Sequence, residues 1–198
     1  MVVKFFDNSF SVRDDLLRKR FLREANLLAK IQHPGIPYVV TKGDVPSGRG
    51  TVPYTVLQFI SGVTFEALLK EKGKLPHEIV ATYIAQILKS LSHVHSVDVI
   101  HRDIKPSNLM ISNSNHTFLI DFSIGYSSAT EPGLTRVTEV GTHMGTVDYM
   151  SPEQKRDMSS VDKRSDLYSL GVVMLELLTG KVDFTGMAAA LSLSLIHI

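Results

Sequence analysis

The chain has 198 residues, of which 43% are hydrophobic, and a formal net charge of +1 at pH 7. This composition is typical of a globular protein with one good core or two small lobes, and it gives no reason to expect bulk nucleic-acid binding. The absence of cysteine excludes a disulfide framework, a zinc–thiolate site and a cysteine nucleophile. No apolar run is long enough to span a membrane, and early charged residues interrupt any signal-peptide pattern, so we expect a cytoplasmic chain.

The N-terminal part predicts a strand followed by a helix. Residues 2–6 are apolar except for Lys4, which taken alone is best interpreted as a lysine that protects an edge strand from aggregation. Residues 13–31 show helical periodicity, and Glu24 stands on the apolar stripe of that helix. A carboxylate on such a face is costly unless it is paired, so Lys4 is its natural partner; the alternative is a solvated position at the edge of the stripe.

The region after this helix predicts two strands, at 38–42 and 51–60, joined by a turn. The residues between them, 43–50, are rich in glycine and resemble a phosphate-binding loop at first sight. They contain neither GxGxxG nor GK[ST], and no helix follows them directly. We therefore expect a mobile hairpin turn there.

Two further helices are predicted at about 64–72 and 77–96. The second contains His93 and His95 near its end. A spacing of two places these side chains on different faces of a helix, which does not suit a shared metal ion. We interpret them as helix-end or core histidines.

A β-hairpin is predicted from two β-prone runs, 109–112 and 117–120, which flank a polar turn. Asn108 precedes the first strand and Asp121 follows the second, so antiparallel pairing brings them to the same end. Asp103 lies in the loop that enters the hairpin. Oxygen ligands of this kind suit Mg²⁺, which takes few protein ligands and keeps the rest of its shell for water and phosphate.

This stretch resembles the catalytic and metal loops of the eukaryotic-type protein kinases. The resemblance is carried by His-Arg-Asp ending at Asp103, an Asn five residues later, and Asp-Phe thirteen residues after that Asn. Lys105 is similar to the lysine of the serine/threonine branch, and residues 145–154 are similar to the substrate-seating segment of bacterial serine/threonine kinases. The apolar helix expected at 166–179 begins with Asp166, which either caps the helix or accepts N–H groups of the catalytic loop.

The resemblance covers about residues 1–186 and implies an incomplete α+β, two-lobed protein-kinase-like fold. We expect a partial β-rich N-lobe at 1–60 and a partial, mainly helical C-lobe at 61–186, followed by a tail at 187–198 that resembles nothing in the family. The strands and glycine-rich loop that precede the strand lysine in the family are absent, as are the last helices of the large lobe. We therefore expect a truncated domain that is unable to fold stably or to catalyse by itself.

The resemblance implies phosphoryl transfer from ATP-Mg²⁺ to Ser or Thr hydroxyls of proteins. Within that chemistry the catalytic carboxylate orients the hydroxyl and accepts its proton, while the hinge backbone holds adenine. A threonine in the segment 124–148, phosphorylated, would bind the arginine beside the catalytic carboxylate. The expected residues are catalytic Asp103, Lys105 and Asn108; ATP-binding Lys4, Glu24, Gln58, Ile60 and Asp121; metal-binding Asn108 and Asp121; and regulatory Arg102, Thr138, Thr142 and Thr146.

Two other functions remain open at this point. A pseudokinase that serves as a protein-binding module is favoured by Ser123, which stands where the family has the glycine of Asp-Phe-Gly, and by the missing phosphate-covering loop. A small-molecule kinase of the aminoglycoside type ranks last, because such enzymes lack a segment like 145–154. The sequence predicts no nucleic-acid partner and no membrane segment, and it leaves dimerisation open.

Overall fold

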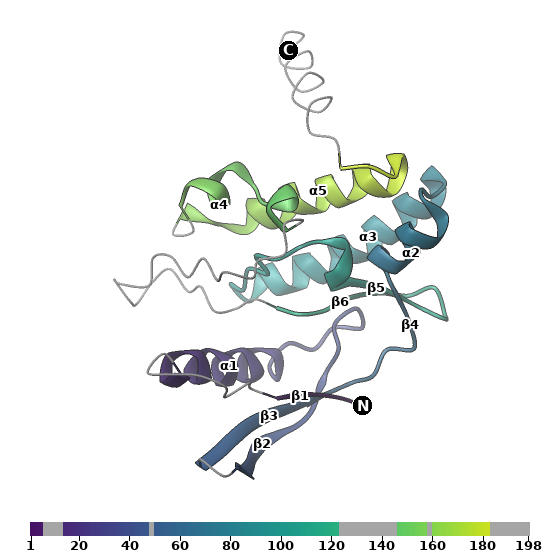
Figure 1. Cartoon of the computed structure of the whole chain (residues 1–198). Coiled ribbons are helices and arrows are strands. Elements are labelled where there is room, and N and C mark those ends of the chain that lie inside the picture. The colour runs from purple at the N-terminus through teal and green to yellow at the C-terminus, as the bar shows by residue number, and fades with distance from the viewer. Residues whose placement is uncertain (6–13, 48–49, 123–145, 158–159, 183–198) are drawn as a thin grey trace.

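The computed structural model describes residues 1–5, 14–47, 50–122, 146–157 and 160–182. They form a small lobe around one sheet and a larger, mainly helical lobe, and Figure 1 shows these one below the other. Within the described residues, no helix combines the length and the apolar character needed to cross a bilayer. In chain order the elements are β1 (Val2–Phe5), α1 (Asp14–Leu28), β2 (Val39–Ser47), β3 (Gly50–Leu57), β4 (Gly62–Thr64), α2 (Phe65–Lys72), α3 (His77–Ser96), η1 (Pro106–Asn108), β5 (Leu109–Ser112), β6 (Thr117–Leu119), η2 (Thr146–Tyr149), α4 (Pro152–Arg156) and α5 (Lys163–Thr179).

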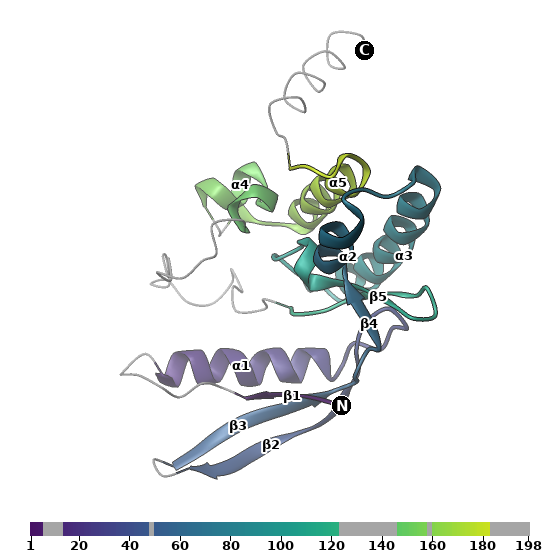
Figure 2. The ribbon, with the colours of Figure 1, turned by 45° about the vertical axis from the view of Figure 1, so that its right-hand side comes forward.

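The small lobe is an antiparallel sheet of order β1-β3-β2, and α1 lies alongside it in both ribbon views (Figures 1 and 2). In the register of β1 with β3, Lys4 lies opposite Thr55. The three predicted strands are confirmed, but the expected turn at 43–50 was too long. Residues 44–47 pair with 50–53, so the strands continue into it, and only residues 48 and 49 lie outside the described chain.

The predicted hairpin is confirmed as β5 and β6, to which β4 adds a third strand. Leu109 pairs with Leu119, and beyond this pair the N–H of Ile120 donates to the carbonyl of Asn108 at 2.9 Å. Asn108 and Asp121 therefore lie at the same end of the hairpin, as predicted. At the start of β4, the backbone of Gly62 lies so close to β5 that only glycine fits. A Cβ on Gly62 would lie 2.0 Å from the carbonyl oxygen of Ile111.

In the helical lobe, α3 packs against both β6 and α5, and the lobe has one apolar core. Phe65 on α2, Ile87 on α3 and Leu177 on α5 are fully buried in it. The bounds predicted for α2 and α3 agree closely with the structure. The helix expected at 166–179 begins three residues earlier, with Asp162 as its N-cap: the Asp162 side chain accepts the N–H of Arg164 at 2.8 Å.

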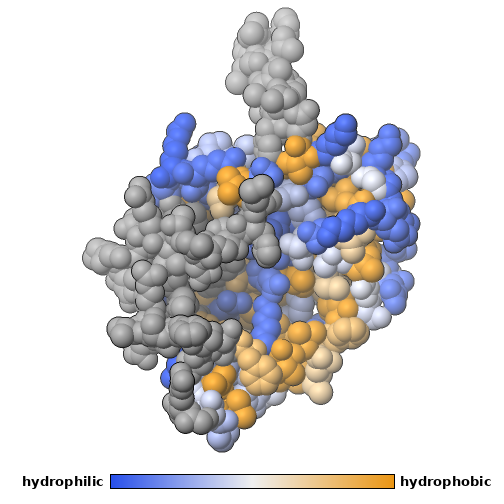
Figure 3. Space-filling view, in the orientation of Figure 1, coloured by the Kyte–Doolittle hydropathy of each residue, from blue (hydrophilic) through white to orange (hydrophobic). Residues whose placement is uncertain are grey.

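An apolar sequence such as that of 166–179 is typical of a helix in a core, but α5 is buried on only part of its surface in the described chain. Polar Ser165 and Ser169 are buried on its inner face, whereas Leu167, Met174 and Leu175 are exposed. Apolar side chains of β1 are also exposed, and the space-filling view shows apolar surface in the part of the molecule that the sheet occupies (Figure 3). Hydrophobic periodicity thus predicted the helix but not which of its faces the lobe covers.

Candidate active site

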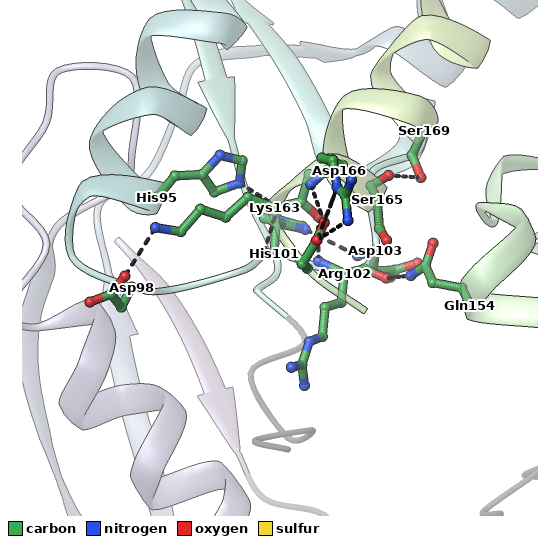
Figure 4. Close-up of polar contacts among 12 residues, drawn as sticks. His95, Asp98, His101, Arg102, Asp103, Gln154, Lys163, Ser165, Asp166 and Ser169 are labelled. Carbon is green, nitrogen blue, oxygen red and sulfur yellow. Dashed lines mark hydrogen bonds and ion pairs between the residues drawn. The ribbon is translucent and has the colours of Figure 1, made fainter. Parts of the chain in front are cut away.

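The loop between α3 and η1 is fixed to α5 by one buried carboxylate. Asp166 is 1% exposed, and its two oxygens accept the backbone N–H groups of His101 at 2.9 Å and Arg102 at 2.8 Å (Figure 4). Because hydrogen bonds to a charged group are stronger than neutral ones, they offset part of the desolvation penalty of this carboxylate. The role predicted for Asp166 is confirmed, and the helix cap is a different residue, Asp162.

His95 supplies a third contact to the same carboxylate. Its Nε2 lies 2.8 Å from Oδ2 of Asp166, and the His95 side chain is 12% exposed (Figure 4). The interpretation of His95 as a helix-end histidine was correct for its place, but it missed this bond. The available signal was its position in the last turn of α3, next to the loop that Asp166 holds.

The neutral ring of His101 links the loop that contains Asp103 to the end of the hairpin. The side chain is fully buried, Nδ1 accepts the N–H of Asp103 at 3.3 Å, and Nε2 donates to the carbonyl of Ile120 at 3.0 Å. Its ring also packs on Phe122, with centroids 4.6 Å apart. Burial lowers the pKa of His101 below 6.5, against the opposing effect of Asp166, so the neutral ring fits both hydrogen bonds.

Asp103, Lys105 and Asn108 are in mutual contact. Oδ2 of Asp103 lies 2.9 Å from Nζ of Lys105 and accepts Nδ2 of Asn108 at 2.8 Å. Nδ2 also donates to the Asp103 carbonyl at 2.8 Å, which uses the amide nitrogen within the loop. The side-chain oxygen of Asn108 is therefore the atom left for a cation, and the Asp103 carboxylate, 21% exposed, remains accessible to a hydroxyl.

The cationic end of Lys4 pairs with Asp121, at the mouth of the hairpin. The expected ion pair between Lys4 and Glu24 does not form within 4 Å among the described residues; Lys4 instead crosses to the other lobe. Burial raises the pKa of Glu24 from 4.5 to about 7, with Lys4 opposing the shift and Asp121 adding to it. Lys4 and Asp121 are nevertheless close enough to Glu24 to shift its pKa. The sequence thus identified Lys4 and Glu24 as neighbours, but the partner of Lys4 in the structure is Asp121.

Arg102 lies beside Asp103, and a nitrogen of its guanidinium group is a candidate anion-binding donor. Its Nε is buried without a hydrogen-bond partner among the described residues, while its backbone carbonyl accepts Nε2 of Gln154 at 2.9 Å. Burial lowers the pKa of Arg102, and Asp166 opposes the shift. An anion placed here would satisfy this buried donor.

The segment after the undescribed residues is anchored to α4 and α5. Ser151 and Gln154 form a capping box at the start of α4, which fixes the position from which Gln154 reaches Arg102. Tyr149 donates its hydroxyl to Glu176 on α5 at 2.7 Å. The bond of Gln154 to Arg102 places the start of α4 next to the loop that contains Asp103, and the bond of Tyr149 fixes the preceding residues to α5.

Several expected site residues cannot be placed. Thr138, Thr142 and Ser123 lie outside the described residues, and so does the side chain of Thr146. At the hinge, the N–H of Gln58 donates to the carbonyl of Tyr38 at 3.0 Å. The described backbone hydrogen bonds outside regular elements use neither the Gln58 carbonyl nor the Ile60 N–H, which leaves one acceptor and one donor there for a ligand.

The two-lobed fold and the contacts around Asp103 are those expected of a protein kinase, and comparison with known families agrees. The protein kinase domain family matches residues 1–194, so the chain belongs to that family. Members of this family generally use ATP and Mg²⁺.

The relatives are bacterial serine/threonine-protein kinases named PknB. The chain is 38% identical over 174 residues to the one from Mycobacterium leprae and 39% identical over 174 residues to the one from Mycobacterium tuberculosis, with 88% of this chain and 27% of each relative covered. A probable PknB from Lactococcus lactis is 32% identical over 197 residues, covering 30% of its length. The chain thus spans between a quarter and a third of the length of these relatives.

Proposed function

We propose that this chain is part of a protein serine/threonine kinase that transfers the γ-phosphoryl group of ATP to Ser or Thr hydroxyls of proteins. The observation that carries the proposal is the contact of Asp103 with Lys105 and Asn108, on a loop that Asp166 holds in place. The catalytic carboxylate accepts the proton of the attacking hydroxyl. The lysine beside it offsets charge on the transferred group, because the transition state is loose and depends on placement and charge.

The nucleotide side of the site combines Lys4, Asp121 and Asn108. The side-chain oxygen of Asn108 and the half-exposed carboxylate of Asp121 fit Mg²⁺, which would neutralise charge across the ATP phosphates. Since Asp121 already binds Lys4, nucleotide binding would transfer Lys4 from this carboxylate to the α- and β-phosphates. Glu24 would then brace the lysine and ionise more readily, and the free hinge groups of Gln58 and Ile60 would hold adenine.

Replacing Asp103 by Asn tests the transfer chemistry. We expect phosphate transfer from labelled ATP to a protein substrate to fall by on the order of 10²–10⁴, because a positioned general base is worth about that much. The matched control is Asp98→Asn, since Asp98 is an exposed residue that pairs only with Lys163 in the described chain. Near-normal transfer by the Asp103 variant would contradict the proposed mechanism.

Activation is proposed to proceed by phosphorylation of Thr138 or Thr142 and binding of that phosphate to Arg102. The Nε of Arg102 has no hydrogen-bond partner among the described residues, which supports this role, because a phosphate accepts hydrogen bonds from guanidinium in a bidentate manner. We expect peptide mass spectrometry after incubation with ATP-Mg²⁺ to find phosphate on one of these threonines. Absence of phosphate from both would remove the idea.

The pseudokinase alternative is not favoured by the comparisons, because the curated relatives are named as kinases. A thermal shift with ATP-Mg²⁺ combined with a transfer assay separates the two functions. Binding without transfer would favour the pseudokinase.

A further inference from the structure

Histidines from different elements meet where the segment after α1 contacts the helical lobe. His33 follows α1, His93 lies in the last turn of α3, and His116 precedes β6. The His33 and His93 rings stack with centroids 5.3 Å apart and planes inclined by 26°. These residues are outside the candidate active site, and the proposed kinase mechanism uses none of them.

The His33 ring takes part in the connection between the two lobes. Its Nδ1 accepts the N–H of Gly35 at 3.1 Å, and the carbonyl of Gly35 accepts the N–H of Leu119 on β6 at 2.8 Å. The first bond requires an unprotonated Nδ1. The junction is also tight, because a Cβ on Gly35 would lie 2.2 Å from Oγ of Ser90 on α3 and 3.2 Å from the Thr117 carbonyl.

The surroundings of the cluster do not favour positive charge. Among the described residues no carboxylate pairs with His33, His93 or His116. Nε2 of His116 is buried and has no hydrogen-bond partner within the described chain, and the His116 ring packs edge-on against Phe118. The titratable groups that act on His33 are both bases, His93 from α3 and His116 from the hairpin.

We propose that the cluster of His33, His93 and His116 is a pH-sensitive connection between the two lobes, closed while the rings are neutral and loosened by acid. Protonation of His33 at Nδ1 would break its bond to Gly35 and place a cation against two other bases. Gly35 is also bonded to Leu119 on β6, so loss of the His33–Gly35 bond would weaken this second bond. The segment after α1 would then be released from the hairpin that leads to Asp121.

The direction of the pH dependence follows from burial. Desolvation first, and then His93 and His116, lower the pKa of His33 below 6.5, so the folded state binds fewer protons than the unfolded state. The stabilisation by this connection is therefore complete above pH 6.5 and is lost as the pH falls below it. Fully buried His101 shifts in the same direction, so a bare loss of stability in acid does not identify the source.

The test uses the whole chain labelled with ¹⁵N and compares the amide exchange protection of Gly35 and Leu119 at about pH 7.5 and about pH 5.5. The variant His33→Asn keeps an acceptor for the amide two residues ahead, as in an Asx turn, but does not titrate. The control His77→Asn changes a histidine that is 82% exposed. This readout needs no kinase activity, so it remains decisive if the proposed function fails.

We expect protection to fall roughly tenfold or more in acid for the wild-type chain and for His77→Asn, after correction for intrinsic exchange, and to stay constant in His33→Asn. A second variant, His93→Phe, keeps a stacked ring but removes a base that lowers the pKa of His33, so it should move the loss to higher pH. Equal protection at both pH values in the wild-type chain would overturn the proposal. So would an acid loss in His33→Asn as large as that of the wild type, or, if that variant does not fold, an unchanged midpoint in His93→Phe.

Discussion

The carboxyl group of Glu24 lies under the opposing influence of Lys4 and Asp121, and burial is the larger effect. Because its pKa is raised to about 7, the side chain is substantially protonated at neutral pH when Lys4 binds Asp121. Ionisation of Glu24 therefore destabilises the protein when no nucleotide is bound. The ionised form would be stabilised if Lys4 moved toward Glu24.

The variant Glu24→Gln tests this description. From pH 4.5 to about 7 the folded wild type binds more protons at Glu24 than the unfolded chain, so this residue lowers stability as the pH rises through that range. We expect Glu24→Gln to have a higher Tm than the wild type at about pH 8 without nucleotide, and an equal Tm near pH 4.5.

Thermal unfolding at both pH values measures the difference, and Glu78→Gln, an exposed carboxylate on α3, is the matched control. The same pH dependence in Glu24→Gln and the wild type would refute the assignment.

At the scale of elements, local pattern predicted most of the architecture. Turn chemistry and alternation gave the β5–β6 hairpin and hence the shared end of Asn108 and Asp121, because antiparallel pairing leaves little choice. Periodicity gave α3 to within a residue or two.

Pattern did not predict long-range partners. The contact of His95 with Asp166 depends on how α3 crosses α5, and the choice of Lys4 between Glu24 and Asp121 depends on the spacing of the lobes. Exposure of Leu167 was missed for a related reason, since an apolar sequence does not tell which face is covered.

Two glycines give opposite predictions for the same substitution. Gly62→Ala would place a Cβ 2.0 Å from the Ile111 carbonyl oxygen, a clash with backbone that cannot move cheaply. We expect this change to destabilise the chain by about 1–3 kcal/mol or more, as overpacking does. Gly171→Ala on α5 meets nothing within 4 Å and should stabilise by about 0.5–1 kcal/mol through helix propensity.

Denaturant unfolding of both variants measures these effects. Loss of stability in Gly171→Ala, or none in Gly62→Ala, would show that β4 and α5 are packed differently.

On the scale of the whole molecule, the candidate site is assembled from both lobes. The small lobe contributes Lys4 and Glu24, and the helical lobe contributes Asp103, Asn108 and Asp121. The ion pair between Lys4 and Asp121 spans the two. A ligand that binds both sides would therefore stabilise the arrangement of the lobes as well as each lobe.

We expect ATP with Mg²⁺ to raise the Tm of the chain, and to raise it less when Mg²⁺ is removed by a chelator. At about 100 times the dissociation constant a ligand contributes about 2.7 kcal/mol. Asp121→Asn should abolish the Mg²⁺-dependent part of the shift. Asp98→Asn is a close control because both aspartates have φ 56, a conformation that Asn also adopts.

Calorimetry of the wild type and both variants, with ATP and with or without Mg²⁺, measures these changes in Tm. Full retention of the Mg²⁺ effect in Asp121→Asn would exclude this residue as a ligand.

The attachment of two successive amides to one carboxylate of α5 has a mechanical consequence. Asp103, the proposed acceptor of the hydroxyl proton, is held with Lys105 and Asn108 on a loop bound to α5, and this attachment does not involve the small-lobe sheet. Opening and closing between lobes would then vary the separation of Lys4 from Asp103 while the acceptor side keeps its internal distances. A change in the angle between the lobes would therefore move Lys4 and a nucleotide bound to it, while the positions of Asp103, Lys105 and Asn108 relative to one another would stay nearly constant.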